Sequence, residues 1–162
     1  MGLCITPKTD LFMVNELGLE MAVYRKTFPK GTDSDYIINE VELQREVSKY
    51  GLAPKVISTD NKTYIDMEDL ESMNVGDTYG EDIECIPPKI LSQMWSILWY
   101  MYTVLGIDYI DVWPRNFVEV NGRVWIIDFG DAHWHDEDEE PNWYLEEIMN
   151  AGHIIDWNCD FQ

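Results

Sequence analysis

The chain has 162 residues, enough for one ordinary domain or for two small lobes that share a cleft. Apolar residues make up 46 % of it, so we expect a packed core and not global disorder. The 31 acidic residues against 11 basic ones give a formal charge of −20. This balance argues against non-specific binding to nucleic acid or to an anionic membrane, because such binding needs clustered cations.

The three cysteines, Cys4, Cys85 and Cys159, lie far apart and form no C-x-x-C pair. Their odd number and their spacing predict neither a disulfide framework nor a cysteine metal site. The first residues lack the charged and apolar segments of a signal peptide, and polar residues interrupt the most apolar stretch, 90–105. We therefore expect a cytoplasmic protein without a membrane span.

The first 70 residues predict strands around a single helix. The segments with strand character are 11–14, 19–28, 55–58 and 62–67. Asn15-Glu16-Leu17-Gly18 is typical of the turn in a first hairpin, and Asp60-Asn61 of the turn in a second. Asp33 lies in a typical helix start, and we expect the helix to end at Gly51.

The remaining residues predict a mainly helical part. The segments with helical character are 87–105 and about 142–150, with a connector and a short helix at 69–86. Gly106 is the expected C-cap of the longer helix. Asn121-Gly122 between alternating apolar residues predicts a hairpin at 117–127, and an acidic run follows at 136–140.

This order of elements is an α+β pattern with a natural division near residue 70. We expect a small antiparallel sheet with one helix at 1–68 and a reduced, mainly helical part at 69–162. No internal repeat is visible in the sequence.

Three polar residues stand on otherwise apolar sequence: Asp111, Asn116 and Asp128. The first two share a loop, and Asp128 ends a strand that pairs back toward that loop, so the hairpin can bring all three together. An aspartate can orient a hydroxyl and accept its proton, and amide and carboxylate oxygens can hold Mg²⁺ against nucleotide phosphates. The alternative is that the three residues are structural turn caps.

Asp111-Val112-Trp113-Pro114-Arg115-Asn116, followed after a hairpin by Asp128-Phe129-Gly130, resembles the catalytic loop and the magnesium-binding segment of protein kinases. The resemblance implies a truncated two-lobed protein-kinase-like fold that uses ATP and Mg²⁺. It also implies that Asp111 is the catalytic base and that Asn116 and Asp128 bind the metal.

Upstream residues extend the resemblance to about residues 10–132. The segment 21–26 is similar to the kinase strand whose lysine holds the nucleotide phosphates, with Lys26 as the candidate and Arg25 as its competitor. Glu40 stands where the kinase helix supplies the glutamate that pairs with this lysine. Ordinary surface roles for Lys26 and Glu40 are the alternatives.

The segment 64–70 resembles the last strand of the kinase small lobe and the hinge that follows it. The resemblance implies that Met67 lies at the back of an adenine pocket. It also implies that backbone groups of Glu68 and Leu70 meet the edge of the adenine.

The chain departs from the kinase pattern in three places. Asn15-Glu16-Leu17-Gly18 is too short for the Gly-rich phosphate loop, and Tyr109-Ile110 stands where most protein kinases have His-Arg. Only about 30 residues follow Gly130, so the large lobe is reduced, and constitutive activity or a second chain that completes the lobe is expected. Arg115 could supply the positive charge that the loop lacks.

The expected function is that of a minimal serine/threonine protein kinase, an ATP- and Mg²⁺-dependent phosphotransferase with a protein substrate. The acidic run 136–140 could attract a basic substrate or partner, although a solvated surface is the simpler interpretation. The alternatives are a small-molecule kinase and a pseudokinase that acts as a binding module. His133-Trp134-His135-Asp136 is interpreted as a polar segment, with a transition-metal site as the alternative.

Overall fold

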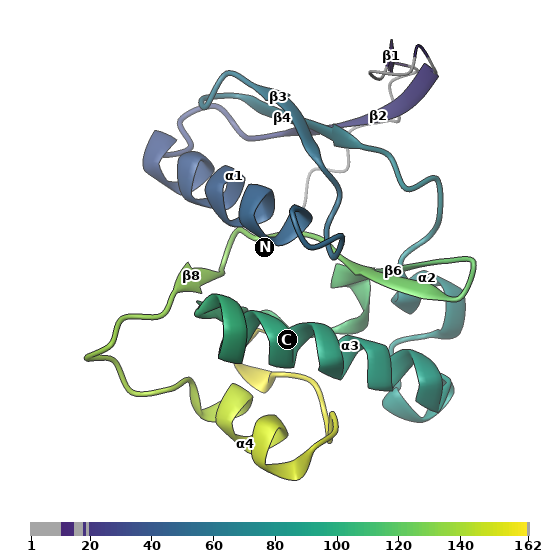
Figure 1. Ribbon diagram of the computed structural model, residues 1–162, viewed down its shortest axis with the longest axis vertical. Helices are drawn as coiled ribbons and strands as arrows, with labels where there is room; N and C mark the ends of the chain where they lie inside the picture. Colours follow the sequence, from purple (N-terminus) through teal and green to yellow (C-terminus); the bar gives the residue numbers. More distant parts are fainter. Residues whose placement is uncertain (1–10, 15–17, 19, 162) are drawn as a thin grey trace. The chain divides into compact units, whose positions relative to one another are not determined.

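The computed structural model describes residues 11–14, 18 and 20–161 (Figure 1). Over these residues the chain is an α+β protein with four α-helices and small antiparallel sheets. It separates into two compact units, 1–71 and 72–162. The observed boundary therefore lies three residues after the expected one, which followed residue 68. Apart from Gly18, the turn expected at 15–18 lies outside the described residues, as do Cys4 and the rest of the N-terminal segment.

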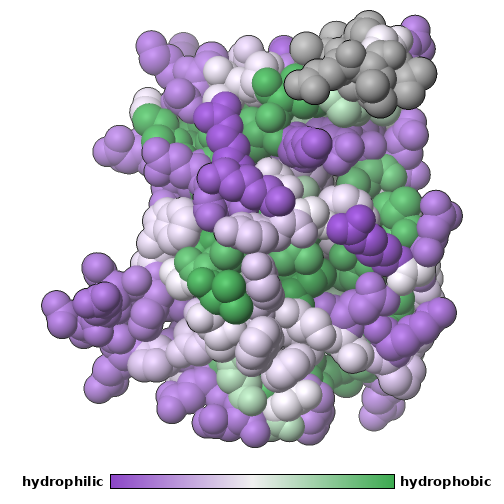
Figure 2. All heavy atoms as spheres, in the orientation of Figure 1, coloured by the Kyte–Doolittle hydropathy of each residue, from purple (hydrophilic) through white to green (hydrophobic). Residues whose placement is uncertain are grey.

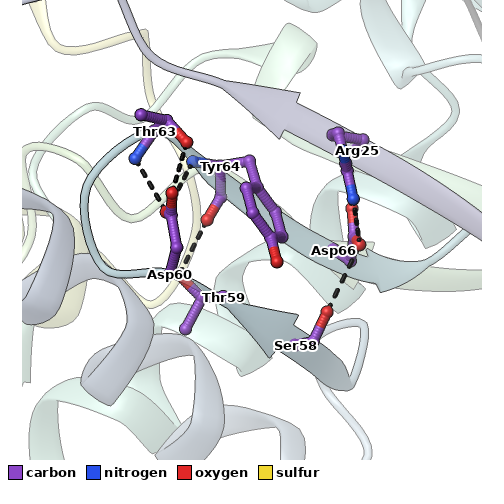
Figure 3. Close-up of polar contacts among 7 residues, drawn as sticks. All are labelled: Arg25, Ser58, Thr59, Asp60, Thr63, Tyr64 and Asp66. Carbon is purple, nitrogen blue, oxygen red and sulfur yellow. Dashed lines mark hydrogen bonds and ion pairs between the residues drawn. The ribbon is translucent and has the colours of Figure 1, made fainter.

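The first unit is built on one antiparallel sheet with the strand order β1-β2-β4-β3. Its strands are β1 (Leu11–Val14), β2 (Glu20–Thr27), β3 (Val56–Thr59) and β4 (Tyr64–Glu68). Both predicted hairpins are confirmed, because β1 pairs with β2 and β3 pairs with β4. Asp60 organises the second turn, where its carboxylate accepts hydrogen bonds from the backbone N–H groups of Thr63 and Tyr64 and from the Thr63 hydroxyl (Figure 3). It also accepts one from the backbone N–H of Lys62.

Helix α1 (Ser34–Ser48) covers one face of this sheet (Figure 1). The Asp33 side chain caps it by accepting a hydrogen bond from the Asp35 N–H at 2.8 Å. The buried cluster between helix and sheet contains Ile37, Val41, Ile65 and Met67. The helix ends before the predicted Gly51, which instead adopts a φ of 71° in the turn that follows.

The second unit is mainly helical and contains two short strand pairs. Its elements are α2 (Val75–Tyr79), η1 (Ile83–Cys85), α3 (Pro88–Tyr100), η2 (Met101–Leu105), β5 (Ile107–Asp108), η3 (Pro114–Asn116), β6 (Phe117–Val120), β7 (Arg123–Ile126), β8 (His133–Trp134), α4 (Trp143–Ala151) and η4 (Cys159–Phe161). The side chain of Gln93 on α3 donates to Gly122 O at 2.9 Å and accepts from the Val124 N–H at 3.0 Å. Trp95 donates to Ile148 O at 2.8 Å, so α3 is tied to both the β6–β7 hairpin and α4.

The predicted helix at 87–105 is present, but its last turn is wider than an α-helix. η2 is a π-helical turn, and the Gly106 N–H closes it by donating to Met101 O. Gly106 has a φ of 69°, so it is the left-handed C-cap that the sequence predicts. π-helical turns are frequent next to functional sites.

The strand pair β5–β8 was not expected from the sequence. Two-residue strands are too short to show the alternation by which strands are recognised. The segment interpreted as a polar stretch therefore begins with β8, whose His133 and Trp134 lie opposite Asp108 and Ile107. The acidic residues 136–140 follow as an exposed loop, drawn among the hydrophilic side chains of Figure 2. In the part of the chain described here, no helix has the length and apolar character needed to cross a bilayer.

Candidate functional site

The β6–β7 hairpin brings Asp128 to the end of the loop that carries Asn116. Antiparallel pairing runs from the Phe117–Ile126 pair up to the turn at Asn121-Gly122. One residue below that first pair, the Ile127 N–H donates to Asn116 O at 2.9 Å. Asp128 thus follows directly on a residue that is bonded to Asn116, as the hairpin prediction requires.

Asn116 is buried, and it contacts Asp111 directly. Its Nδ2 donates to the backbone carbonyl of Asp111 at 2.9 Å. Burial raises the pKa of the Asp111 carboxyl to about 6, an effect that the Asn116 side chain opposes and that the negative charges of Asp128 and Asp131 reinforce. The second unit therefore gathers the three expected residues, with Asp131 as a further carboxylate that the sequence analysis did not single out.

Asp128 has a backbone conformation that is unusual for a residue with a side chain. Its φ is 62°, in the left-handed region, and its Oδ1 accepts a hydrogen bond from the Gly130 N–H at 3.2 Å. Such a conformation costs about 1–3 kcal/mol and persists only where the surroundings impose it. The adjacent Phe129 is fully buried, so the segment is anchored immediately after the strained residue.

Tyr109 provides part of that anchor. Its hydroxyl donates to Ile127 O at 2.7 Å, and its ring meets the Phe129 ring edge-to-face with 5.7 Å between centroids. The sequence showed only that Tyr109 replaces the histidine common in kinases. Nothing in the sequence around Tyr109 indicates that it contacts residues some twenty positions later.

The C-terminal segment holds the same loop from another side. Asn158 is 1 % exposed, and its Nδ2 donates to Ile110 O at 2.7 Å. Its backbone N–H donates to Val112 O at 3.2 Å, so Asn158 is bonded to the residues on both sides of Asp111. This residue was not expected from the sequence, because nothing near position 158 marks a partner 48 residues earlier.

Arg115 was expected to supply positive charge to the loop, but its guanidinium is engaged elsewhere. It donates to Asp77 at 2.9 Å and to Glu81 at 2.6 Å. These carboxylates neutralise much of its charge, so a phosphate would have to displace them. The structure therefore favours a role for Arg115 in joining the loop to α2.

In the first unit, Lys26 is ion-paired with Glu40, whose side chain is fully buried in α1. Arg25, one residue earlier on β2, is bound instead by Asp66, with two hydrogen bonds of 2.7 and 2.8 Å (Figure 3). Successive side chains of a strand point to opposite faces of the sheet, which explains the different partners. The pair expected from the kinase resemblance is therefore formed by Lys26 and not by Arg25, and its role in nucleotide binding stays a prediction.

Two of the three residues expected at an adenine pocket, Met67 and Glu68, make other contacts within the first unit. Met67 is buried, with its sulfur 3.4 Å from Gln44 Nε2. The Glu68 N–H donates to Lys55 O at 2.9 Å within the sheet, so it is not available to an adenine. Leu70 is half-buried just beyond β4.

The donor atoms at Asn116 and Asp128 suit magnesium. Because Asn116 donates through Nδ2, its Oδ1 is the amide atom that could ligate a cation. An amide oxygen and a carboxylate are hard ligands, which Mg²⁺ prefers over nitrogen or sulfur donors. The negative charges of Asp128 and Asp131 near Asp111 also favour a cation at this place.

No protein-family model matches the chain, and no curated protein matches it. Function must therefore be inferred from the two sets of residues: Lys26 with Glu40 in the first unit, and Asp111, Asn116 and Asp128 in the second.

Proposed function

We propose that the chain is an ATP- and Mg²⁺-dependent phosphotransferase with a reduced protein-kinase-like fold, acting on a serine or threonine hydroxyl of a protein. The observation that carries the proposal is the meeting of Asp111, Asn116 and Asp128 where the loop and the hairpin join. The buried ion pair of Lys26 and Glu40 supports it independently.

Each of these residues has a distinct role. The Asp111 carboxylate would orient the substrate hydroxyl and accept its proton. Asn116 and Asp128 would hold Mg²⁺, which supplies charge neutralisation to the phosphates when bound. The Tyr109 and Asn158 hydrogen bonds would keep these side chains in place, which matters because phosphotransfer depends mostly on positioning and electrostatics.

Lys26 would bind nucleotide phosphates while Glu40 holds it in position. The Lys26 side chain is 14 % exposed, whereas the side chain of Glu40 is fully buried. A flexible lysine side chain loses much freedom when it binds an anion, and an existing ion pair reduces that loss.

A concave, acidic surface in the second unit supports a basic protein substrate. A cavity of about 630 Å³ is lined by Glu81, Asp82, Ile83, Glu84, Trp113, Asp156 and Trp157. Trp113 lies two residues after Asp111 in the same loop. Carboxylates and indole rings both attract cationic side chains, so a lysine or arginine near the phosphorylated hydroxyl would be accommodated here.

The test is transfer of radiolabelled phosphate from ATP with Mg²⁺ to a generic basic protein and to the chain itself. Asp111→Ala and Asp128→Asn should lose transfer, whereas Asp136→Asn, a change of an exposed acid, should keep it. The proposal fails if the wild-type protein transfers phosphate no faster than Asp111→Ala and Asp128→Asn. A Mg²⁺-dependent thermal shift with ATP but no transfer would favour the pseudokinase, and transfer to small hydroxyl compounds alone would favour a small-molecule kinase.

A further inference from the structure

A second group of ligating side chains lies around the β5–β8 pair of the second unit. Asp108 pairs in register with His133, and both imidazoles of this segment face its carboxylate. His133 Nε2 and His135 Nδ1 each lie 3.3 Å from Asp108 Oδ2. Glu139 Oε2 lies 3.6 Å from His133 Nε2, so four side chains gather around a short strand pair.

These separations are those of atoms that share a metal ion. The ligating atoms of Asp108, His133 and Glu139 all lie within 4.8 Å of one another. Around a tetrahedral zinc ion with bonds of 2.0 to 2.1 Å, neighbouring ligand atoms are about 3.3 Å apart. The observed distances of 3.3 and 3.6 Å would need little rearrangement to accept an ion.

The burial of Asp108 is an independent indication that its carboxylate can bind a cation. Its side chain is 2 % exposed, and its Oδ1 accepts no hydrogen bond from the described residues. A buried carboxylate is costly unless its charge is neutralised and its oxygens are bonded. The other oxygen, Oδ2, faces two imidazoles, which are the most common protein ligands of transition metals.

We propose that Asp108, His133 and Glu139 form a binding site for one divalent transition-metal ion, with Zn²⁺ as the best match and with the His135 ring beside the Asp108 ligand. An imidazole nitrogen together with two carboxylate oxygens suits Zn²⁺ and not Mg²⁺, which prefers oxygen ligands alone. The site is separate from Asn116 and Asp128 and does not depend on the phosphotransferase proposal.

The fold already orients His133 for this role and places His135 beside the Asp108 ligand. β-sheet pairing holds His133 opposite Asp108, and the His135 N–H donates to Gly106 O at 2.7 Å. The His135 ring also packs beside the Tyr102 ring, at 6.1 Å between centroids. Such supporting contacts around ligands usually strengthen metal binding.

A metal at this position would join the segment after Gly130 to β5, three residues before Asp111. Asp108 belongs to β5 and His133 to β8, so an ion held by both would stabilise the strand pair. Metal binding should therefore raise thermal stability and protect residues 131–139 from hydrogen exchange.

The experiment titrates the full chain, freed of metal by a chelator, with Zn²⁺ in a calorimeter and with Co²⁺ by visible absorption. The wild-type protein should bind one equivalent. His133→Ala and Glu139→Gln should weaken binding at least 10-fold. His153→Ala changes the remaining histidine of the chain, which is exposed and lies outside the cluster, and should bind as the wild type does.

Two further measurements keep the result unambiguous. Replacing Cys4, Cys85 and Cys159 by serine removes thiolate ligands and should leave binding unchanged. Zn²⁺ should raise the melting temperature of the wild type and of His153→Ala, but not of His133→Ala. The side chains of His133 and Glu139 are 43 % and 54 % exposed, so their variants should fold. Absence of stoichiometric binding, binding lost with the cysteines, or unchanged binding by both cluster variants would each overturn the proposal.

Discussion

The hydroxyl of Tyr109 donates a hydrogen bond to the carbonyl of Ile127, which immediately precedes Asp128. The same ring packs edge-to-face on Phe129, immediately after Asp128. A single side chain thus contacts the residues on both sides of an aspartate whose own backbone is strained, with a φ of 62°. The left-handed conformation of Asp128 is therefore held by its neighbours.

Tyr109→Phe should distinguish the contribution of the hydroxyl hydrogen bond from that of the ring contact. Removing the hydroxyl deprives the Ile127 carbonyl of this donor and should lower the free energy of unfolding by about 1 kcal/mol in urea denaturation. Tyr109→Ala also creates a cavity and should cost about 3–5 kcal/mol. If both variants have the same stability as the wild type, the anchoring role is wrong. The rate of phosphate transfer by Tyr109→Phe should fall by more than the small decrease in the folded fraction would cause, because Asp128 becomes less well positioned.

Lys26 and Arg25 form a matched pair of cations on successive positions of β2. Lys26→Met should reduce phosphate transfer by about 100-fold, because it removes a charge that acts on the phosphates. Arg25→Met should leave transfer nearly unchanged but cost about 1–3 kcal/mol of stability, because the Asp66 carboxylate, which is only 8 % exposed, loses two donors. Equal loss of transfer in the two variants would contradict the assignment of Lys26.

Asn158→Ala should loosen the loop around Asp111. The change removes one of two hydrogen bonds to Ile110 O, which keeps its bond from the Val112 N–H at 2.9 Å, so it should cost about 1 kcal/mol. Faster hydrogen exchange at residues 109–113 is the expected readout. Asn150→Ala, at an exposed position near the end of α4, serves as the control and should leave exchange in the loop as it is.

The acid sensitivity of the first unit should depend on Asp60. Hydrogen bonds from the Thr63 side chain and from neighbouring backbone N–H groups hold the pKa of this carboxyl well below its ordinary value. Because the folded-state pKa lies below the unfolded one, the stabilisation is present above pH about 4 and is lost as the pH falls below that value. Asp60→Asn should therefore be less stable than the wild type at pH 7, and the difference should shrink in acid. A difference that is constant from pH 7 to pH 2.5 would contradict this cause.

Most helices and hairpins of this chain could be predicted because their signals are local. The cap at Asp33, the left-handed glycine at 106 and the turns at Asp60-Asn61 and Asn121-Gly122 act within a few residues. The proximity of Asp128 to Asn116 was also predicted from a local signal, because a tight hairpin leaves the residues at its two ends adjacent. These features need no knowledge of distant parts of the chain.

The sequence by itself therefore determined the α+β order of elements and the gathering of Asp111, Asn116 and Asp128. Only the tertiary structure decided which cation of β2 meets Glu40, because alternation separates Arg25 from Lys26 without saying which face α1 covers.

Tertiary structure also decided the contacts of Tyr109, Asn158 and Arg115 and the cluster around Asp108. Each of these joins residues far apart in the chain. The free energy of such contacts comes from burial and hydrogen bonding in the folded state, so no short stretch of sequence carries their signature.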